Sequence, residues 1–343
     1  MISKTERKLT YPITLLLSSA PRKTCESMAS IANMSGDSLL RLLKQEAITT
    51  EELIKVAYQV LRGKRWYMII DDTIIDKIYS KEIEGACDNY DSSARKSYRS
   101  LCSVVAVLTD GKRTIPIAED LWISKEFTPN EYRKKWEIAY NLLVQLKKLT
   151  PIYMLVADGL YATENMIRSC NNLGMLFEMR FHSNRVITYN GIVAQIRDLQ
   201  ALSLTGRRTI RTKRGYWKGM VLYFTSVKRV NKNGSYSIVY QVSNYSASAA
   251  QHVSNYGFRW NIEMFFRTAK QHLGLQHCQV RSRTAQRNHI MNVFFAYTIL
   301  QLEKSKRRLL NPEAALRLLK RKKFTFLTQL ISRSVQIFEP IYA

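Results

Sequence analysis

The chain has 343 residues, 46% of them hydrophobic, and its 53 lysines and arginines against 27 acidic residues give a net charge of +26. This apolar content excludes a disordered chain and is enough for two or three packed units. No apolar run reaches the roughly 18 residues of a membrane span, and Tyr11 to Ser18 is too short for a secretory signal. We expect a cytoplasmic, nucleoid-associated protein with a polyanionic partner and no membrane, because the charge exceeds what solubility needs.

Cofactor motifs of several familiar kinds are missing from the sequence. The five cysteines are odd in number and never adopt C-x-x-C spacing, and the five histidines show no metal-ligand spacing. Neither a disulfide framework nor a zinc site is therefore expected. The sequence also lacks a G-x-x-x-x-G-K-[ST] loop, so we expect no nucleotide cofactor.

Residues 1–62 are predicted to form a helical DNA-binding region. The segment Met28 to Leu43 fits a helix-turn-helix, with Asn33 at the tight turn and Ser35 capping the second helix. Arg41 and Lys44 are candidates for DNA contact on that second helix. Any two short amphipathic helices joined by a polar turn give a similar pattern, and this alternative stays open.

Residues 63–176 show two apolar strands that each end in an acid. Trp66 to Ile70 precedes Asp71 and Asp72, and Tyr153 to Ala157 precedes Asp158. A hairpin is expected over 101–108 and 114–121, and helices over 129–149 and 163–173. An aspartate after a strand is often only a turn residue or a helix cap. Because side chains alternate along a strand, only one of the two adjacent acids can face a site.

Residues 177–246 switch to short β-like runs with a turn signal at 233–234 and are predicted to form a β-rich basic subdomain. Between residues 180 and 235, twelve lysines and arginines stand against the single acid Asp198. Aromatic residues such as Trp217 and Tyr236 are interleaved, a pattern that suits phosphate neutralisation with stacking on bases. An ordinary charged surface, or a surface that binds ribosomal RNA or anionic lipid, is the alternative.

Residues 247–303 contain a Y-x2-R-x3-E-x6-K pattern, and residues 304–343 are expected to be a basic helical tail. On one continuous helix the residues of this pattern and Arg267 would share a face, opposite an apolar stripe. The pattern consists of Tyr256, Arg259, Glu263 and Lys270, and the stripe of Phe258, Ile262, Phe265 and Ala269. A plain amphipathic helix with an ion pair between Glu263 and Arg267 would show the same spacing.

This pattern resembles the signature of DDE transposases of the insertion-sequence-four family. The resemblance implies an α/β fold: a ribonuclease H-like catalytic core, which is a mixed sheet with flanking helices, carrying a β-rich insertion beside a helical N-terminal domain. It implies that three metal-binding carboxylates come together, and its Asp-Thr dipeptide favours Asp72 over Asp71. The three are Asp72, Asp158 and Glu263.

Three carboxylates at a sheet edge would hold two Mg²⁺ ions, or Mn²⁺, because hard oxygen ligands without a soft partner argue against zinc. The resemblance also implies that Tyr256, Arg259 and Lys270 bind phosphates near the cleaved end, and that Trp217 or Tyr236 can hold a flipped base. Arg267 joins the first group through the helical projection. A core position for Trp217 is the alternative.

The predicted function is a transposase that binds the ends of an insertion sequence, cleaves DNA and joins it to a target. Its expected partners are double-stranded DNA, both terminal inverted repeats and target, and a second copy of the chain in a synaptic complex. A ribonuclease H-like nuclease without strand transfer would use the same three acids. A catalytically silent DNA-binding derivative would keep the fold and the charge.

Overall fold

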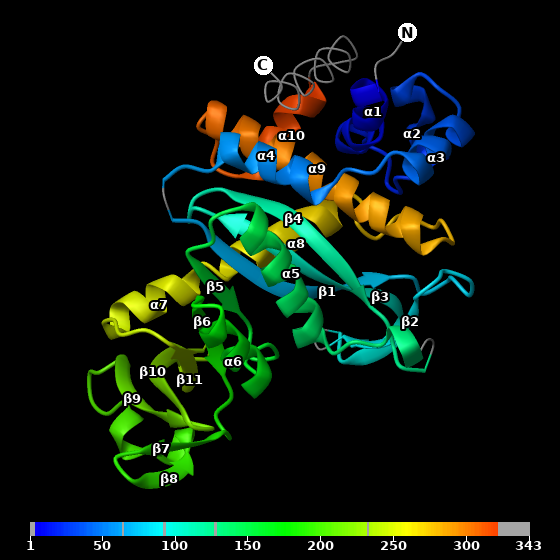
Figure 1. Ribbon diagram of the computed structural model, residues 1–343. Helices are drawn as coiled ribbons and strands as arrows, with labels where there is room; N and C mark the ends of the chain where they lie inside the picture. The colour runs from blue at the N-terminus through cyan, green and yellow to red at the C-terminus, as the bar shows by residue number, and fades with distance from the viewer. Residues whose placement is uncertain (1–3, 64, 92–93, 127–128, 232, 322–343) are drawn as a thin grey trace. The chain divides into compact units, whose positions relative to one another are not determined.

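A computed structural model describes residues 4–63, 65–91, 94–126, 129–231 and 233–321 (Figure 1). The chain divides by its contacts into two compact units. Unit 1 comprises Met1–Lys64, Asp72–Lys134 and Ile262–Ala343, and unit 2 comprises Arg65–Asp71 and Lys135–Asn261. Two elements contribute to both units, the strand β1 (Tyr67–Asp76) and the helix α8 (Trp260–His272).

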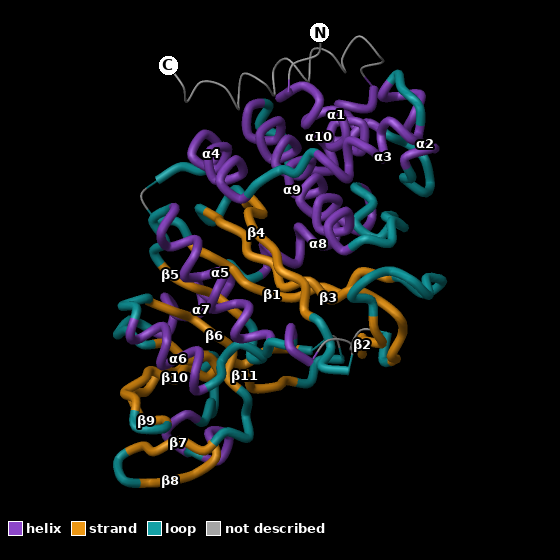
Figure 2. Tube along the Cα trace, turned by 45° about the vertical axis from the view of Figure 1, so that its right-hand side comes forward, coloured by secondary structure: helices purple, strands orange, loops and turns teal. Residues whose placement is uncertain are grey.

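Unit 1 gathers its helices around α9. These helices are α1 (Lys4–Leu17), α2 (Cys25–Ala32), α3 (Gly36–Gln45), α4 (Thr50–Val60), α9 (Arg283–Lys306) and α10 (Pro312–Arg321). The 24-residue α9 is buried on most of its surface, because it contacts α1, α3, α4 and α10 as well as the strand β4 (Figure 2). Residues 1–62 were predicted as a domain of their own, but their helices α1 to α4 pack inside unit 1. The reason is that α9 offers these helices an apolar surface.

The strands of unit 1 are largely antiparallel. They are β2 (Cys87–Asp91), β3 (Lys96–Thr109), β4 (Thr114–Trp122) and the second half of β1. The long β3 pairs with β2 through residues 96–100 and with β4 through residues 102–109, and β1 is its other neighbour. The predicted hairpin is present as β3 and β4, and α9 packs on β4.

Unit 2 contains the parallel strands. The first half of β1 pairs with β5 (Met154–Ala157), which pairs in turn with β6 (Leu176–Phe181), and both pairings are parallel. A 3₁₀ turn, Pro129–Glu131, precedes α5 (Lys135–Leu149) in the chain. The next helix, α6 (Glu164–Asn172), connects β5 to β6 and is capped by Thr163, whose side chain accepts from the amide of Met166.

The predicted β-rich segment continues this sheet with antiparallel strands. They are β7 (Val186–Tyr189), β8 (Ile192–Gln195), β9 (Ile210–Trp217), β10 (Met220–Val230) and β11 (Tyr236–Ser243), with 3₁₀ turns at Ile196–Asp198 and Gln200–Leu202. The neighbours run β6, β11, β10, β9, β7, β8. The helix α7 (Ala249–Gly257) follows and contacts β5, β6, β9, β10 and β11.

The architecture is α/β, a mixed sheet with flanking helices, as predicted from the sequence. Within the part of the chain that is described, no helix combines the length and apolar character needed to cross a membrane. Of the predicted basic tail, residues 304–321 complete α9 and form α10, whereas residues 322–343 lie outside the described residues.

Candidate active site

The Y-x2-R-x3-E-x6-K pattern lies on two helices rather than one. Tyr256 is near the end of α7, and α8 begins at Trp260. Between them the amide of Arg259 donates to the carbonyl of Tyr256, only three residues back, at 3.0 Å. Such a turn is tighter than an α-helix, so a rotation of 100° per residue does not carry across it. The expectation that Tyr256 and Arg259 share one helical face with Lys270 is therefore wrong.

Within α8 the expected faces are present. Spacings of four and three residues place Glu263, Arg267 and Lys270 along one side of the helix. The opposite side is buried and consists of Ile262, Phe265 and Ala269. Phe265 packs against α9, where its ring centroid lies 5.4 Å from that of Phe294 and 4.9 Å from that of Tyr297. This apolar contact fixes the helix in unit 1 and holds the acidic and basic side away from the core.

The first acidic strand does not end at its two aspartates. Asp71 and Asp72 lie in the middle of β1, which continues to Asp76, although the sequence predicted that the strand ended at this pair. The pairing of β1 with β5 stops one residue earlier, at Ile70. Both aspartates are half-buried, so the alternation of exposure along β1 is interrupted at this point. The strand continues because its second half has a new neighbour, β3.

Asp71 forms an ion pair with the arginine of the pattern. The guanidinium Nη1 of Arg259 lies 2.9 Å from Oδ2 of Asp71, and both side chains are about four-fifths covered. The residue before Arg259, Phe258, packs its ring 4.4 Å from that of Tyr67, which lies on β1 like Asp71. The junction between α7 and α8 is therefore attached to β1 by one charged and one aromatic contact.

Asp72 lies on the side of β1 that faces Cys102 and Lys270 in unit 1. The thiol of Cys102 is 3.6 Å from Oδ2 of Asp72. Burial lowers the pKa of Lys270, and the nearby carboxylates of Asp76 and Asp91 oppose this shift. Because Asp76 and Asp72 are four residues apart on one strand, their side chains point the same way. Lys270 shares its side of α8 with Glu263, so that side of α8 faces Asp72.

Asp158 is the first residue after β5, as predicted, and it contacts the tyrosine of the pattern. The hydroxyl of Tyr256 donates to Oδ1 of Asp158 at 3.5 Å, a long hydrogen bond. Burial raises the pKa of Tyr256 to about 12. The positive charge of Arg259, whose guanidinium lies 5.9 Å from the tyrosine ring, opposes this rise, as do Arg180 and Arg229. The phenol is therefore protonated at neutral pH and acts as a hydrogen-bond donor.

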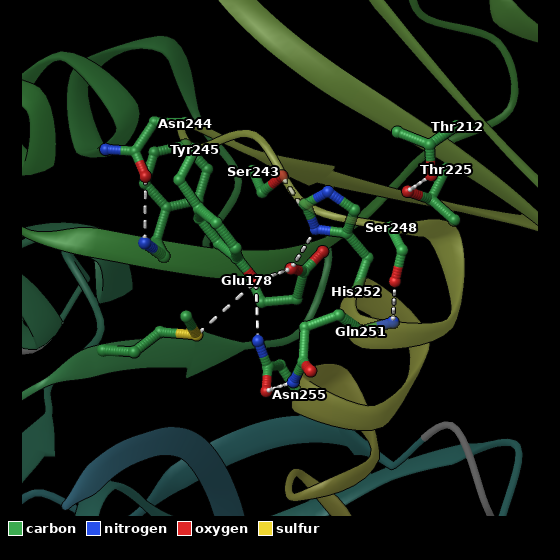
Figure 3. A network of polar contacts seen from close by, with 12 residues as sticks. Glu178, Thr212, Thr225, Ser243, Asn244, Tyr245, Ser248, Gln251, His252 and Asn255 are labelled. Atoms are coloured by element: carbon green, nitrogen blue, oxygen red, sulfur yellow. Dashed lines mark hydrogen bonds and ion pairs between the residues drawn. The ribbon is translucent and has the colours of Figure 1, made fainter. Parts of the chain in front are cut away.

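A buried polar network connects α7 to β6 and to Tyr245 (Figure 3). Glu178 on β6 is fully buried, and its Oε2 accepts from the hydroxyl of Tyr245 at 2.8 Å and lies 2.9 Å from Nδ1 of His252. The amide of Asn255 donates to the same tyrosine oxygen at 2.7 Å. His252 and Asn255 belong to α7, so the network ties this helix to β6 one turn before Tyr256.

The charges in this network depend on one another. Burial raises the pKa of Glu178, while hydrogen bonds from His252 and Tyr245 oppose the rise. Burial likewise raises the pKa of Tyr245. Sequence spacing does not reveal the pair, because Glu178 and His252 are 74 residues apart. The one local signal is an acid inside the apolar run of residues 176–181, where a glutamate needs a buried partner.

The predicted helix-turn-helix segment has the expected local geometry. Asn33 ends α2 in the left-handed conformation at φ 50°, and the hydroxyl of Ser35 accepts from the amide of Ser38 at the start of α3. Arg41 and Lys44 are exposed on α3. The C-terminal end of α3 is held by Asn288 of α9, whose amide donates to the carbonyl of Leu43 at 2.9 Å.

Trp217 is a core residue of unit 2. Its side chain is only 8% exposed, and its ring meets that of Phe181 edge-on at 5.3 Å. The guanidinium of Arg185 lies 5.2 Å from the indole. The exposed aromatic residues of this subdomain are Tyr216 and Tyr236, so base stacking by Trp217 would first require this packing to open.

Two residues of the pattern contact strand acids in the structure, Tyr256 with Asp158 and Arg259 with Asp71. Among the described residues, no three or more histidine, cysteine, aspartate or glutamate side chains form a ready metal-binding group. Asp158 belongs to unit 2, whereas Asp72 and Glu263 belong to unit 1. The geometry defines an α/β protein in which carboxylates of two parallel strands contact Tyr256 and Arg259. These two residues come just before α8, one side of which carries acidic and basic side chains.

Comparison with known families agrees with this class. The family model described as the transposase DDE domain matches residues 68–299. The match covers well over half of the chain and includes every predicted acid and the whole pattern, so this chain belongs to the transposase DDE domain family. No curated protein shows significant sequence similarity to the chain.

Proposed function

We propose that this protein is a transposase of the insertion-sequence-four type, which cleaves DNA at the ends of its element and joins the ends to a target. The observation that carries the proposal is the pairing of the pattern with the strand acids: Tyr256 with Asp158, and Arg259 with Asp71. An amphipathic helix without chemistry would have no reason to meet two acids on neighbouring strands. The family assignment supports the transposase class.

We also propose that the core is ribonuclease H-like. The strand β1 has β3 as its neighbour on one side and the parallel β5 on the other, and β3 forms a hairpin with β4. In the chain, the helices α5 and α6 come before and after β5. This order of a strand, a hairpin and two further parallel strands is the one expected from the resemblance.

Asp72, Asp158 and Glu263 are the proposed catalytic acids. Asp72 is preferred to Asp71 because Asp71 is engaged by Arg259, whereas Asp72 points to the side of β1 that faces Lys270 and therefore Glu263. Their oxygen donors suit Mg²⁺ or Mn²⁺. Mg²⁺ is commonly held by one or two carboxylates together with substrate phosphates, so a preformed cage of three protein ligands is not required.

The residues of the chain have separate tasks in this proposal. Two divalent ions, when bound, would activate the attacking oxygen and stabilise the leaving oxygen of an in-line displacement at phosphorus. Tyr256 and Arg259 would donate to the phosphates that flank the reacting one, and Lys270 and Arg267 would continue that contact along α8. Because hydrolysis and joining are the same displacement with different attacking oxygens, one site would serve both.

DNA recognition is proposed for the α2–α3 pair. The helix α3 has the caps and the buried side chains Leu39, Leu42 and Leu43 of a second helix in a helix-turn-helix. Arg41 and Lys44 point away from that buried side and would contact the element ends. A homodimer in a synaptic complex in the cytoplasm is the proposed assembly, by resemblance alone.

The test is cleavage and strand transfer on labelled DNA that carries the flanking sequence of the element, with Mg²⁺ or with EDTA. Metal-dependent nicking at the element end followed by joining to a target, lost in Asp158→Asn and Glu263→Gln, is the expected result. Cutting without joining would identify a nuclease instead. Salt-sensitive binding without chemistry in any metal would identify a silent DNA-binding derivative.

A further inference from the structure

Two exposed arginines near Tyr256 have no acidic partner among the residues that the structure describes. Arg180 lies on β6 and Arg229 on β10, and within the described parts of the chain neither forms an ion pair with a carboxylate. Some other exposed arginines of this protein are paired, as Arg168 is with Glu164 at 2.9 Å. An arginine without a carboxylate keeps its five donors for another anion.

Arg180 points to the side of the sheet that α7 covers. It lies two residues after Glu178 on β6, so the two side chains share a face. Glu178 contacts His252 of α7, which identifies that face. In register, Met179 of β6 pairs with Ala157 of β5, which places Arg180 next to the strand end that carries Asp158.

Arg229 lies on the same face, farther along the sheet. Arg180 pairs in register with Gln241 of β11, and Gln241 pairs with Thr225 of β10. Arg229 follows Thr225 by four residues on β10, so its side chain points the same way. Its neighbour Lys228 points to the opposite face, where its ammonium lies 4.0 Å from the ring of Tyr236.

The charges of both arginines reach the site. Tyr256 donates to Asp158, and its pKa is lowered by Arg180 and by Arg229 as well as by Arg259, against the larger effect of burial. The positive charges of three guanidinium groups on different elements therefore act on one phenol. Positive groups gathered in this way, on a face that ends at a carboxylate, would attract a phosphate chain.

We propose that Arg180 and Arg229 bind consecutive phosphates of a DNA strand and direct that strand along the α7 side of the sheet to Asp158. This inference rests on the proposed function and adds to it a path for the substrate. Arginine suits the role because its planar fork binds phosphate oxygens in pairs. Contacts of this kind position DNA without reading its sequence.

The experiment measures DNA binding by the full-length protein over a series of salt concentrations, with an element-end duplex and an unrelated duplex of equal length. Each lost phosphate contact is expected to reduce the slope of log K against log salt by about 0.9. Arg180→Gln and Arg229→Gln should each show this loss equally on both duplexes, and the double variant should lose about twice as much. Arg180→Lys should keep the wild-type slope.

Lys228→Gln is the matched control, because it removes one positive charge from the adjacent residue on the other face. It should leave the slope unchanged, and thermal unfolding of each variant shows that the fold is kept. Suppose that the wild-type protein binds and nicks DNA, but that Arg180→Gln and Arg229→Gln show the same salt slope as Lys228→Gln. This result would overturn the present inference and leave the proposed function intact. A wild-type protein that neither binds DNA in a salt-dependent way nor nicks it would overturn the proposed function as well.

Discussion

The lysines buried in unit 1 and two arginines exposed in unit 2 differ in whether their donors are bonded within the protein. In unit 1, Lys23 is 5% exposed and donates to the carbonyls of Leu15 at 2.7 Å and Ser18 at 2.6 Å. Lys77 is 1% exposed and donates to the carbonyl of Cys278. In unit 2, Arg180 and Arg229 are exposed and have no carboxylate partner among the described residues.

The difference separates groups that hold the protein together from groups that act on something else. A buried lysine is stable only when groups of the protein replace the water that it has lost. His289 follows the same rule, because Nδ1 contacts the hydroxyl of Tyr11 and Nε2 the carbonyl of Gly274, and burial lowers its pKa to about 3. An exposed arginine under no such constraint keeps its donors available for a ligand.

The largest expected effect comes from applying this distinction to the two adjacent acids of β1. Asp71 is held in an ion pair, so its role is to fix Arg259, whereas Asp72 is the proposed metal ligand. Asp72→Asn should lower the rate of DNA nicking by about 10³-fold or more, because a metal contributes several kcal/mol to the transition state. The measurement is single-turnover nicking in Mg²⁺, with DNA binding followed in parallel.

Asp71→Asn is the control for that prediction. It keeps the shape of the side chain and weakens only the contact with Arg259, so nicking should fall by about tenfold while binding changes little. If Asp71→Asn abolished nicking and Asp72→Asn left it nearly intact, the assignment of the first acid would be reversed.

A large loss of stability is expected from the network beneath α7. Glu178→Ala would remove the buried carboxylate that His252 and Tyr245 share, so the free energy of unfolding of unit 2 should drop by about 3 kcal/mol. Glu178→Gln keeps an acceptor and should cost less. Denaturant unfolding measures both changes. Equal stability of the alanine and wild-type proteins would show that the network does not hold α7.

Local signals in the sequence were sufficient for much of the fold. Ser35 and Asn33 gave the cap and the turn between α2 and α3, because each acts on backbone groups a few residues away. The apolar run before Asp158 gave β5, and the spacing of Ile262 and Phe265 gave the buried side of α8. These features depend on neighbours in the chain, which a single sequence displays.

Features that depend on distant contacts could not be predicted in this way. The extension of β1 beyond Asp72 depends on its pairing with β3, and the partnership of Glu178 with His252 depends on where α7 packs. The break between α7 and α8 had a local sign, Gly257, which the helical projection ignored. The contacts of Asp71 and Asp158 with the pattern also required the tertiary structure.

The pH dependence of stability is the next effect in size and tests the structural role of the buried lysines. Burial lowers the pKa of Lys23 to about 7, against 10.5 for an ordinary lysine. Between these values the unfolded chain binds a proton that the folded chain has lost, so stability should rise with pH, by at most about 1.4 kcal/mol per pH unit. Lys23→Met should flatten this rise between pH 7 and 10.

Lys77 leaves part of the rise in place, because burial lowers its pKa to about 8. The matched control is Lys81→Met, at an exposed position, which should keep the full slope. Denaturant unfolding at a series of pH values supplies the slopes. A rise that is unaltered in Lys23→Met would mean that this lysine keeps its proton in the folded protein.

The smallest expected effect concerns two exposed cations in unit 1, which test whether an unpaired exposed cation indicates DNA contact in both units. Arg41 and Lys44 lie on α3 without an ion pair among the described residues, like the arginines of unit 2. If α3 reads the element ends, Arg41→Gln should lower the preference for the end over an unrelated duplex by about tenfold. Lys44→Gln should weaken both duplexes equally and reduce the salt slope by about 1, because an ammonium binds phosphate as a point charge. Competition binding measures both effects. The control is Arg317→Gln, because Arg317 is an exposed arginine of α10.

A preference for the element end that is unchanged in Arg41→Gln would mean that α3 is only a packing helix. An exposed cation without a partner would then not be a sufficient sign of DNA contact in unit 1.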